Sequence, residues 1–165
     1  MSNTVLILVS LTFLAIVVSI YLEIRRQIKP RIKVYFPDGS TRASYRAKEE
    51  TNVSIHIQNR GRFGFPKPVA TAVSVFIFTS PNLLLKELRC GRMSDSVEKK
   101  GVSGGIFGGM HSLGIREALT LFHKEVEVIT VLMQMPEATG SYSIKVPIVS
   151  NEGDLGVHEL EIIVF

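Results

Sequence analysis

Residues 51–61 read Thr51-Asn52-Val53-Ser54-Ile55-His56-Ile57-Gln58-Asn59-Arg60-Gly61, and this stretch decides the expected fold. Its apolar residues alternate with polar ones, a period of two that is typical of a half-buried β-strand. Asn59-Arg60-Gly61 then ends the strand with residues that favour a turn. Because the apolar face of a strand must be covered by a second layer, the stretch predicts a layered β structure.

The same alternation recurs along the chain, and turn residues separate the segments that carry it. We predict about seven short strands, within residues 32–36, 53–58, 73–77, 83–88, 126–135, 142–148 and 160–164. A change of phase near Val128 and Ile129 indicates a β-bulge, while residues 115–122 fit either a helix or a strand. The pattern predicts an all-β chain that folds as a single Ig-like antiparallel β-sandwich.

The N-terminus has a different pattern, because residues 2–22 carry no charge. About 20 apolar residues in a helix span the hydrocarbon core of a bilayer. A cleaved signal peptide would have a basic start and a small-residue cleavage site, and this stretch instead ends in Glu23, Arg25 and Arg26. The sequence therefore predicts one retained transmembrane helix at residues 1–24, preceding the sandwich.

Basic residues follow this stretch directly. We expect a basic juxtamembrane linker at residues 25–30 and the sandwich domain at residues 31–165. Anionic lipid headgroups attract such a cluster, so we expect membrane lipid as one partner. The charge also favours a cytoplasmic position for the domain. The membrane-surface patch predicted in this way consists of Arg25, Arg26, Lys29, Arg31 and Lys33.

Two motifs carry a family resemblance. One is residues 51–61 followed by the alternating stretch 72–77, and the other is residues 135–146, which contain Gly140-Ser141-Tyr142. Together they resemble the Ig-like domains of the CARDB and alpha-galactosidase-associated types found in archaeal and bacterial surface proteins. The resemblance implies an extracytoplasmic spacer, adhesion or partner-binding domain over roughly residues 31–165. In such a domain we expect the hydroxyl of Tyr142 to return to the backbone as a tyrosine corner.

The sequence contains no motif that indicates a metal site, a phosphate-binding loop or a catalytic site. Its four histidines share no metal-ligand spacing with one another or with the single cysteine, Cys90. The glycine-rich segment, predicted as a loop at about residues 91–114, lacks the Gly-Lys-Ser/Thr ending of a phosphate-binding loop. We therefore expect no metal, no cofactor, no small-molecule substrate and no catalytic residue. The basic residues also lack the aromatic pattern expected for nucleic-acid binding.

Two loops are candidates for partner contacts, because aromatic or apolar side chains lie among their turn residues. The interaction candidates are Phe63, Phe65, Phe107 and Met110. The sequence thus favours a non-enzymatic single-pass membrane protein whose Ig-like sandwich binds a protein or a membrane surface. The alternative is an extracytoplasmic component of the cell envelope or an appendage, of an archaellum stator-like, pilin-like or surface-layer-associated kind.

Overall fold

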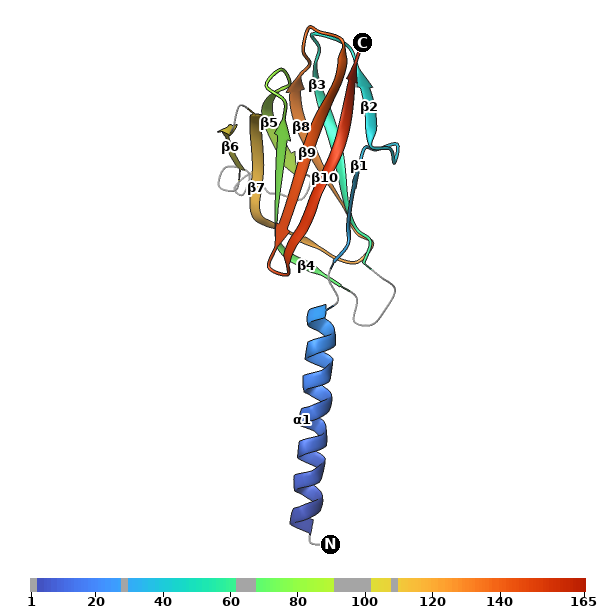
Figure 1. Cartoon of the computed structure of the whole chain (residues 1–165), viewed down its shortest axis with the longest axis vertical. Coiled ribbons are helices and arrows are strands. Elements are labelled where there is room, and N and C mark those ends of the chain that lie inside the picture. The colour runs from blue at the N-terminus through green and yellow to red at the C-terminus, as the bar shows by residue number, and fades with distance from the viewer. Residues whose placement is uncertain (1–2, 28–29, 62–67, 91–101, 108–109) are drawn as a thin grey trace.

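The computed structural model describes residues 3–27, 30–61, 68–90, 102–107 and 110–165. Within these ranges one helix precedes a series of strands, and the helix projects from one end of the β-structure (Figure 1). The elements are α1 (Asn3–Gln27), β1 (Ile32–Tyr35), β2 (Arg42–Tyr45), β3 (Glu50–Asn59), β4 (Ala70–Thr79), β5 (Leu84–Cys90), β6 (Val102–Phe107), β7 (Met110–Leu121), β8 (Val126–Gln134), β9 (Gly140–Ser150) and β10 (Gly153–Val164).

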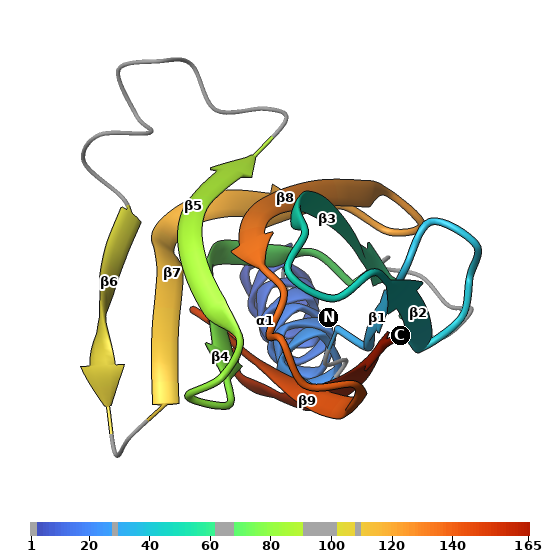
Figure 2. The same cartoon turned by 90° about the horizontal axis from the view of Figure 1, so that it is seen from above.

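The strands form two sheets packed face to face (Figure 2). The smaller sheet has the strand order β1-β3-β8-β5, and the larger sheet has the order β2-β10-β9-β4-β7-β6. Paired strands are antiparallel, except that the edge strand β2 runs parallel to β10. The prediction of a β-sandwich is confirmed.

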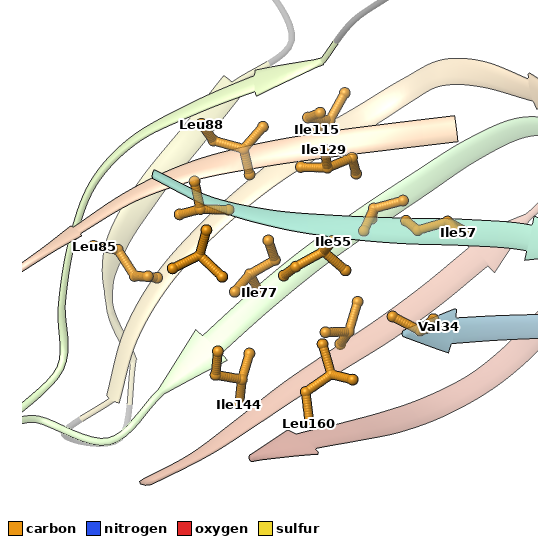
Figure 3. Close-up of a cluster of buried hydrophobic side chains, with 14 of the residues drawn as sticks. Val34, Ile55, Ile57, Ile77, Leu85, Leu88, Ile115, Ile129, Ile144 and Leu160 are labelled. Carbon is orange, nitrogen blue, oxygen red and sulfur yellow. The ribbon is translucent and has the colours of Figure 1, made fainter. Parts of the chain in front are cut away.

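The core lies between the sheets and consists of the apolar residues that alternate along each strand. Val53, Ile55 and Ile57 of β3 are fully buried, as are Ile77 of β4 and Ile144 of β9. Figure 3 shows these isoleucines gathered in one cluster that draws on both sheets. The alternation read from the sequence therefore identifies the inward face of these strands.

The Asn-x-Gly motif at the end of β3 is a buried polar corner. The Nδ2 of Asn59 donates to the carbonyl oxygens of Pro68, at 2.9 Å, and Leu121, at 3.1 Å. Its Oδ1 accepts the backbone N–H of Gly61 at 3.1 Å, so both ends of the amide are satisfied. A Cβ at Gly61 would lie 2.0 Å from Cγ of Pro68. Asparagine and glycine are thus both required for the ends of β3 and β7 to meet the chain before β4.

The predicted tyrosine corner is present. The hydroxyl of Tyr142 donates to the carbonyl oxygen of Ala138 at 2.8 Å. This bond joins the start of β9 to the turn that precedes it and fixes where the strand enters the sheet.

The described part of the glycine-rich segment, residues 102–107 and 110–114, is strand and differs from its prediction as a loop, while residues 91–101 and 108–109 lie outside the described residues. Residues of β6 and β7 pair as an antiparallel hairpin in which Ser103 lies opposite Gly114 and Phe107 lies opposite Met110. Residues 115–121 continue β7 and are a strand rather than a helix. Glycine has a low strand propensity, so the local pattern does not reveal pairing that depends on the neighbouring strand.

The predicted bulge in residues 126–135 is also misplaced. Strand β8 pairs with β3 without interruption, and Ile129, Val131 and Met133 all face the core. The irregularity lies in the opposite neighbour, β5, between Leu85 and Glu87. The change of phase read from the sequence arises because β8 carries apolar residues on both faces.

The predicted membrane anchor needs correction. A spanning helix must combine a length of about 20 residues with sustained apolar character. In the part of the chain that the structure describes, no helix meets both conditions. The predicted location as a single-pass membrane protein is therefore wrong. The boundaries at residues 24, 30 and 31 remain predictions, with β1 beginning at Ile32.

The central core position gives the first test. We expect Ile55→Ala to lower the free energy of unfolding by about 2 to 5 kcal/mol, because it removes buried area and leaves a cavity. The control Ser143→Ala changes an exposed residue of β9 and is expected to stay within about 0.5 kcal/mol of wild type. Denaturant unfolding measures both. Equal losses in the two variants would contradict the assignment of the core face.

The tyrosine corner gives a second test. Tyr142→Phe keeps the ring and removes only the hydroxyl that donates to Ala138, so we expect a loss of about 0.5 to 1.5 kcal/mol. Tyr35→Phe, on an exposed face of the smaller sheet, is the matched control. If both variants unfold at the same denaturant concentration as wild type, the hydroxyl of Tyr142 does not stabilise the corner.

Candidate functional site

The outer face of the larger sheet carries a group of apolar side chains where alternation would place polar ones. Val157 of β10 is 59% exposed and Val149 of β9 is 43% exposed. Pro147 lies opposite Val157 in the sheet, and Phe76 and Phe78 of β4 are partly exposed on the same face. We name this group the outer strip and define it as Phe76, Phe78, Pro147, Val149 and Val157.

Neighbouring β7 explains why the ring of Phe76 lies close to the sheet. Gly114 is paired with Phe76, and a Cβ at Gly114 would lie 2.4 Å from Cδ1 of that ring. The absence of a side chain at Gly114 therefore gives the ring its space. The guanidinium carbon of Arg116 lies 6.0 Å from the ring centre, at the outer limit of a cation–π contact.

A polar rim borders the outer strip on the side of β2. Nζ of Lys145 lies 3.9 Å from Oε1 of Glu159, and Nε of Arg42 lies 2.5 Å from Oε2 of Glu161. The hydroxyl of Ser141 also donates to Glu161. That hydrogen bond is the main cause that lowers the pKa of Glu161; burial opposes it, and the charge and hydrogen bond of Arg42 add smaller lowering effects. Arg42, Ser141, Glu159 and Glu161 line part of an open hollow of about 380 Å³.

A half-buried histidine, His158, lies on the other side of this sheet. His158 follows Val157 in β10 and points to the opposite side, and its Nε2 is buried without a hydrogen-bond partner among the described residues. Burial disfavours the charged imidazolium and lowers the pKa of His158, against a smaller effect of a hydrogen bond with the Leu155 backbone.

The structure describes two of the four interaction candidates predicted from the sequence. Phe63 and Phe65 lie outside the described residues. Phe107 ends β6, Met110 begins β7, and the two are paired in the sheet, with Met110 exposed. The structure brings these two residues together, and a role in binding remains a prediction for them.

The predicted basic patch is placed only in part as well. Arg25 and Arg26 lie in the last turns of α1, Lys29 lies outside the described residues, and Arg31 is exposed just before β1. The ammonium of Lys33 lies 4.9 Å from the ring centre of Tyr35. That contact belongs to the outer face of the smaller sheet. Nothing in the described residues supports a lipid partner.

The outer strip was not predicted from the sequence, although a pattern for it exists. One apolar face was expected for each strand, whereas residues 75–78 of β4 are apolar in both phases. In the same way Val149 follows Ile148, and Pro147 follows Val146. Apolar residues in both phases indicate a strand with two apolar faces.

The other side-chain clusters and hollows in the described residues give less support for a functional site. No cluster of three or more histidine, cysteine or acidic residues there could hold a metal ion. An open hollow of about 540 Å³ near the start of β5 is lined in part by Leu84, Pro136 and the ion-paired Lys48 and Glu137. It holds no pair of groups arranged for acid–base or nucleophilic chemistry.

Comparison with known proteins gives a fold and no family. No family model matches the chain. No curated protein matches it either. Solved structures of cohesins do resemble it. A chain of the Coh-OlpA–Doc918 cohesin–dockerin complex of Clostridium thermocellum has a TM-score of 0.51 at 14% identity, covering 82% of this chain and 99% of its own.

Two further cohesins agree. The cohesin module of a family 33 glycoside hydrolase from Clostridium perfringens has a TM-score of 0.51 at 11% identity, with 84% of this chain and 98% of its own covered. The type III cohesin module of the ScaE scaffoldin of Ruminococcus flavefaciens has a TM-score of 0.50 at 12% identity, with 84% and 89% covered. The chain therefore has a cohesin-like β-sandwich fold, and the CARDB type in particular gains no support.

His158 makes stability depend on pH in a defined direction. Because the pKa of His158 is lowered in the folded state, the unfolded chain binds more protons below its ordinary value near 6.5. We expect the free energy of unfolding to be unaffected by this group above about pH 6.5 and to fall as the pH drops below it.

The measurement is denaturant unfolding between about pH 7.5 and 5. His158→Gln is expected to flatten the slope in this range, and the control Ser143→Ala, at an exposed non-titrating position of β9, is expected to keep it. A slope that His158→Gln leaves unchanged would show that burial does not disfavour the charged ring.

Proposed function

We propose that this chain is a non-catalytic protein-interaction module that binds a protein partner through the outer strip. The observation that carries the proposal is the exposure of Val149 and Val157 beside Pro147 on the outer face of the larger sheet. Removing apolar area from water is favourable by about 25 cal/mol per Å², from which the costs of association are then subtracted. A contiguous apolar group on an otherwise polar sheet face is the kind of surface that a partner covers.

The surroundings of the outer strip fit this role. Residues of the strip belong to β4, β9 and β10, which are hydrogen-bonded to one another within the sheet. Such a surface is formed before binding, so little conformational entropy is lost when a partner docks. Lys145, Glu159, Arg42 and Glu161 provide charges of both signs at the rim. An apolar centre with a polar rim is the usual anatomy of a protein interface.

The fold supports the same class of function. Coh-OlpA, which shares the β-sandwich, is a cohesin in complex with a dockerin, so a sandwich of this shape serves protein binding there. The described residues of our chain add no arrangement of catalytic groups that would favour an enzyme.

The proposal predicts that charges placed on the outer strip weaken partner binding. In the double variant Val149→Lys with Val157→Lys, two ammonium groups would be desolvated at the interface, so we expect partner binding to weaken by at least about tenfold. The measurement is affinity capture from the source cells followed by titration of the captured protein. Thermal unfolding should remain close to that of wild type, because both positions are exposed.

The matched control is Asn52→Lys with Ser44→Lys. It adds the same charge at two exposed polar positions outside the outer strip, on β3 and β2. We expect it to bind the captured protein as wild type does. Equal binding by the strip variant and wild type would place the binding surface elsewhere on the sandwich.

A further inference from the structure

Strand β6 is the outermost strand of the larger sheet. It pairs with β7 along one edge, and no strand among the described residues pairs with its other edge. In Figure 2, β6 stands at the rim of the molecule, farther from the centre of the sandwich than β7 and β5. An unpaired strand edge presents backbone donors and acceptors that can template a further strand.

The other edge strands carry charges that discourage such pairing. Lys33 lies in β1, Arg42 lies in β2, and β5 contains Lys86, Glu87 and Arg89. The sequence of β6 is Val102-Ser103-Gly104-Gly105-Ile106-Phe107, which contains neither a charge nor a proline. Among the four edge strands that the structure describes, β6 alone lacks the residues that normally block strand addition.

The register of β6 determines which of its residues share a face. Val102 lies opposite Ile115, Gly104 opposite Leu113 and Ile106 opposite His111. Ile115 is a core residue, so the even-numbered positions of β6 belong to the inward face of the sheet. The odd-numbered positions belong to the outer face, where Ser103 lies opposite Gly114.

We propose that β6 pairs antiparallel with β6 of a second copy of this chain, so that Gly104 lies opposite Gly104 on the two-fold axis. Successive residues of a strand alternate between the two faces of the sheet, and directly opposite residues point to the same face. If both copies keep their inward faces on one side of the joined sheet, even-numbered residues therefore oppose even-numbered ones, and one residue lies on the two-fold axis opposite its own copy. With Gly104 in that place, Val102 of each copy lies opposite Ile106 of the other. Glycine at the axis leaves no side chains to collide.

This pairing is favoured over the alternatives that the sequence allows. A register centred on Gly105 would set Gly104 against Ile106 and leave Val102 without an apolar neighbour. Self-pairing of β5 about its central residue would set Glu87 against Glu87, which is unfavourable for like charges directly opposite one another. The uncharged sequence of β6 and the match of Val102 with Ile106 therefore point to a second copy as the occupant.

A site-specific cross-link in the full chain tests the proposal. Residues directly opposite in antiparallel strands have Cβ atoms close enough for a disulfide, so Gly104→Cys is expected to give a covalent dimer under mild oxidation. The native Cys90 is buried, and the parent protein shows its background. Val102→Cys with Ile106→Cys tests the same register with a different pair, in case the change at Gly104 prevents folding.

The controls separate strand pairing from chance contact. Adding Ile106→Lys to Gly104→Cys should lower the dimer yield at least fivefold, because two ammonium groups would enter the joined sheet. Adding Thr120→Lys, at an exposed position of β7, should leave the yield unchanged. Val149→Lys with Val157→Lys should also leave it unchanged, which separates this edge from the outer strip.

Three results would overturn the proposal. They are the absence of a dimer in both cysteine variants, a dimer yield that Ile106→Lys does not change, and a mixed disulfide with a different protein in place of the second copy. The last result would identify β6 as an edge for a foreign strand.

Discussion

The burial of two apolar sheet faces against each other is the interaction on which the rest of this molecule depends. Ile55 and Ile129 from the smaller sheet and Ile77 and Ile144 from the larger sheet belong to one fully buried cluster. Because hydrophobic burial is the dominant favourable term in folding, the inward phase of each strand is fixed. The outward phase is then free to vary, and the features that distinguish this chain lie there and at the sheet edges.

Unequal sheet sizes have a consequence for function. The larger sheet has six strands and the smaller sheet has four, so the larger sheet ends in the β6–β7 hairpin at the rim of the sandwich. Its central strands carry the outer strip on a surface that hydrogen bonding holds in place. Its edge carries the uncharged β6. The two surfaces are distinct, so binding of another protein and pairing with a second copy are compatible in geometry.

Sequence reasoning succeeds where a local pattern has a local cause. Alternation gave the core face of β3, and Asn59 and Tyr142 occupy the corners that their motifs predict. It failed for β6, because glycine-rich pairing depends on β7 and not on propensity. Charge-free composition at the N-terminus led to a wrong membrane location. The outer strip was missed because Val149 and Phe76 look like part of a core run until the sheet register is known.

Amide hydrogen exchange of the full chain, followed by mass spectrometry, tests the central claim most directly. The account predicts slowest exchange in β3, β8, β4 and β9, which lie inside the two sheets, and faster exchange in the edge strands β1 and β2. The amides of Ile55 and Ile144 should both exchange only through global unfolding, since the same core holds both strands. Rapid exchange in either β3 or β9 while the other stays protected would contradict a single core between two sheets.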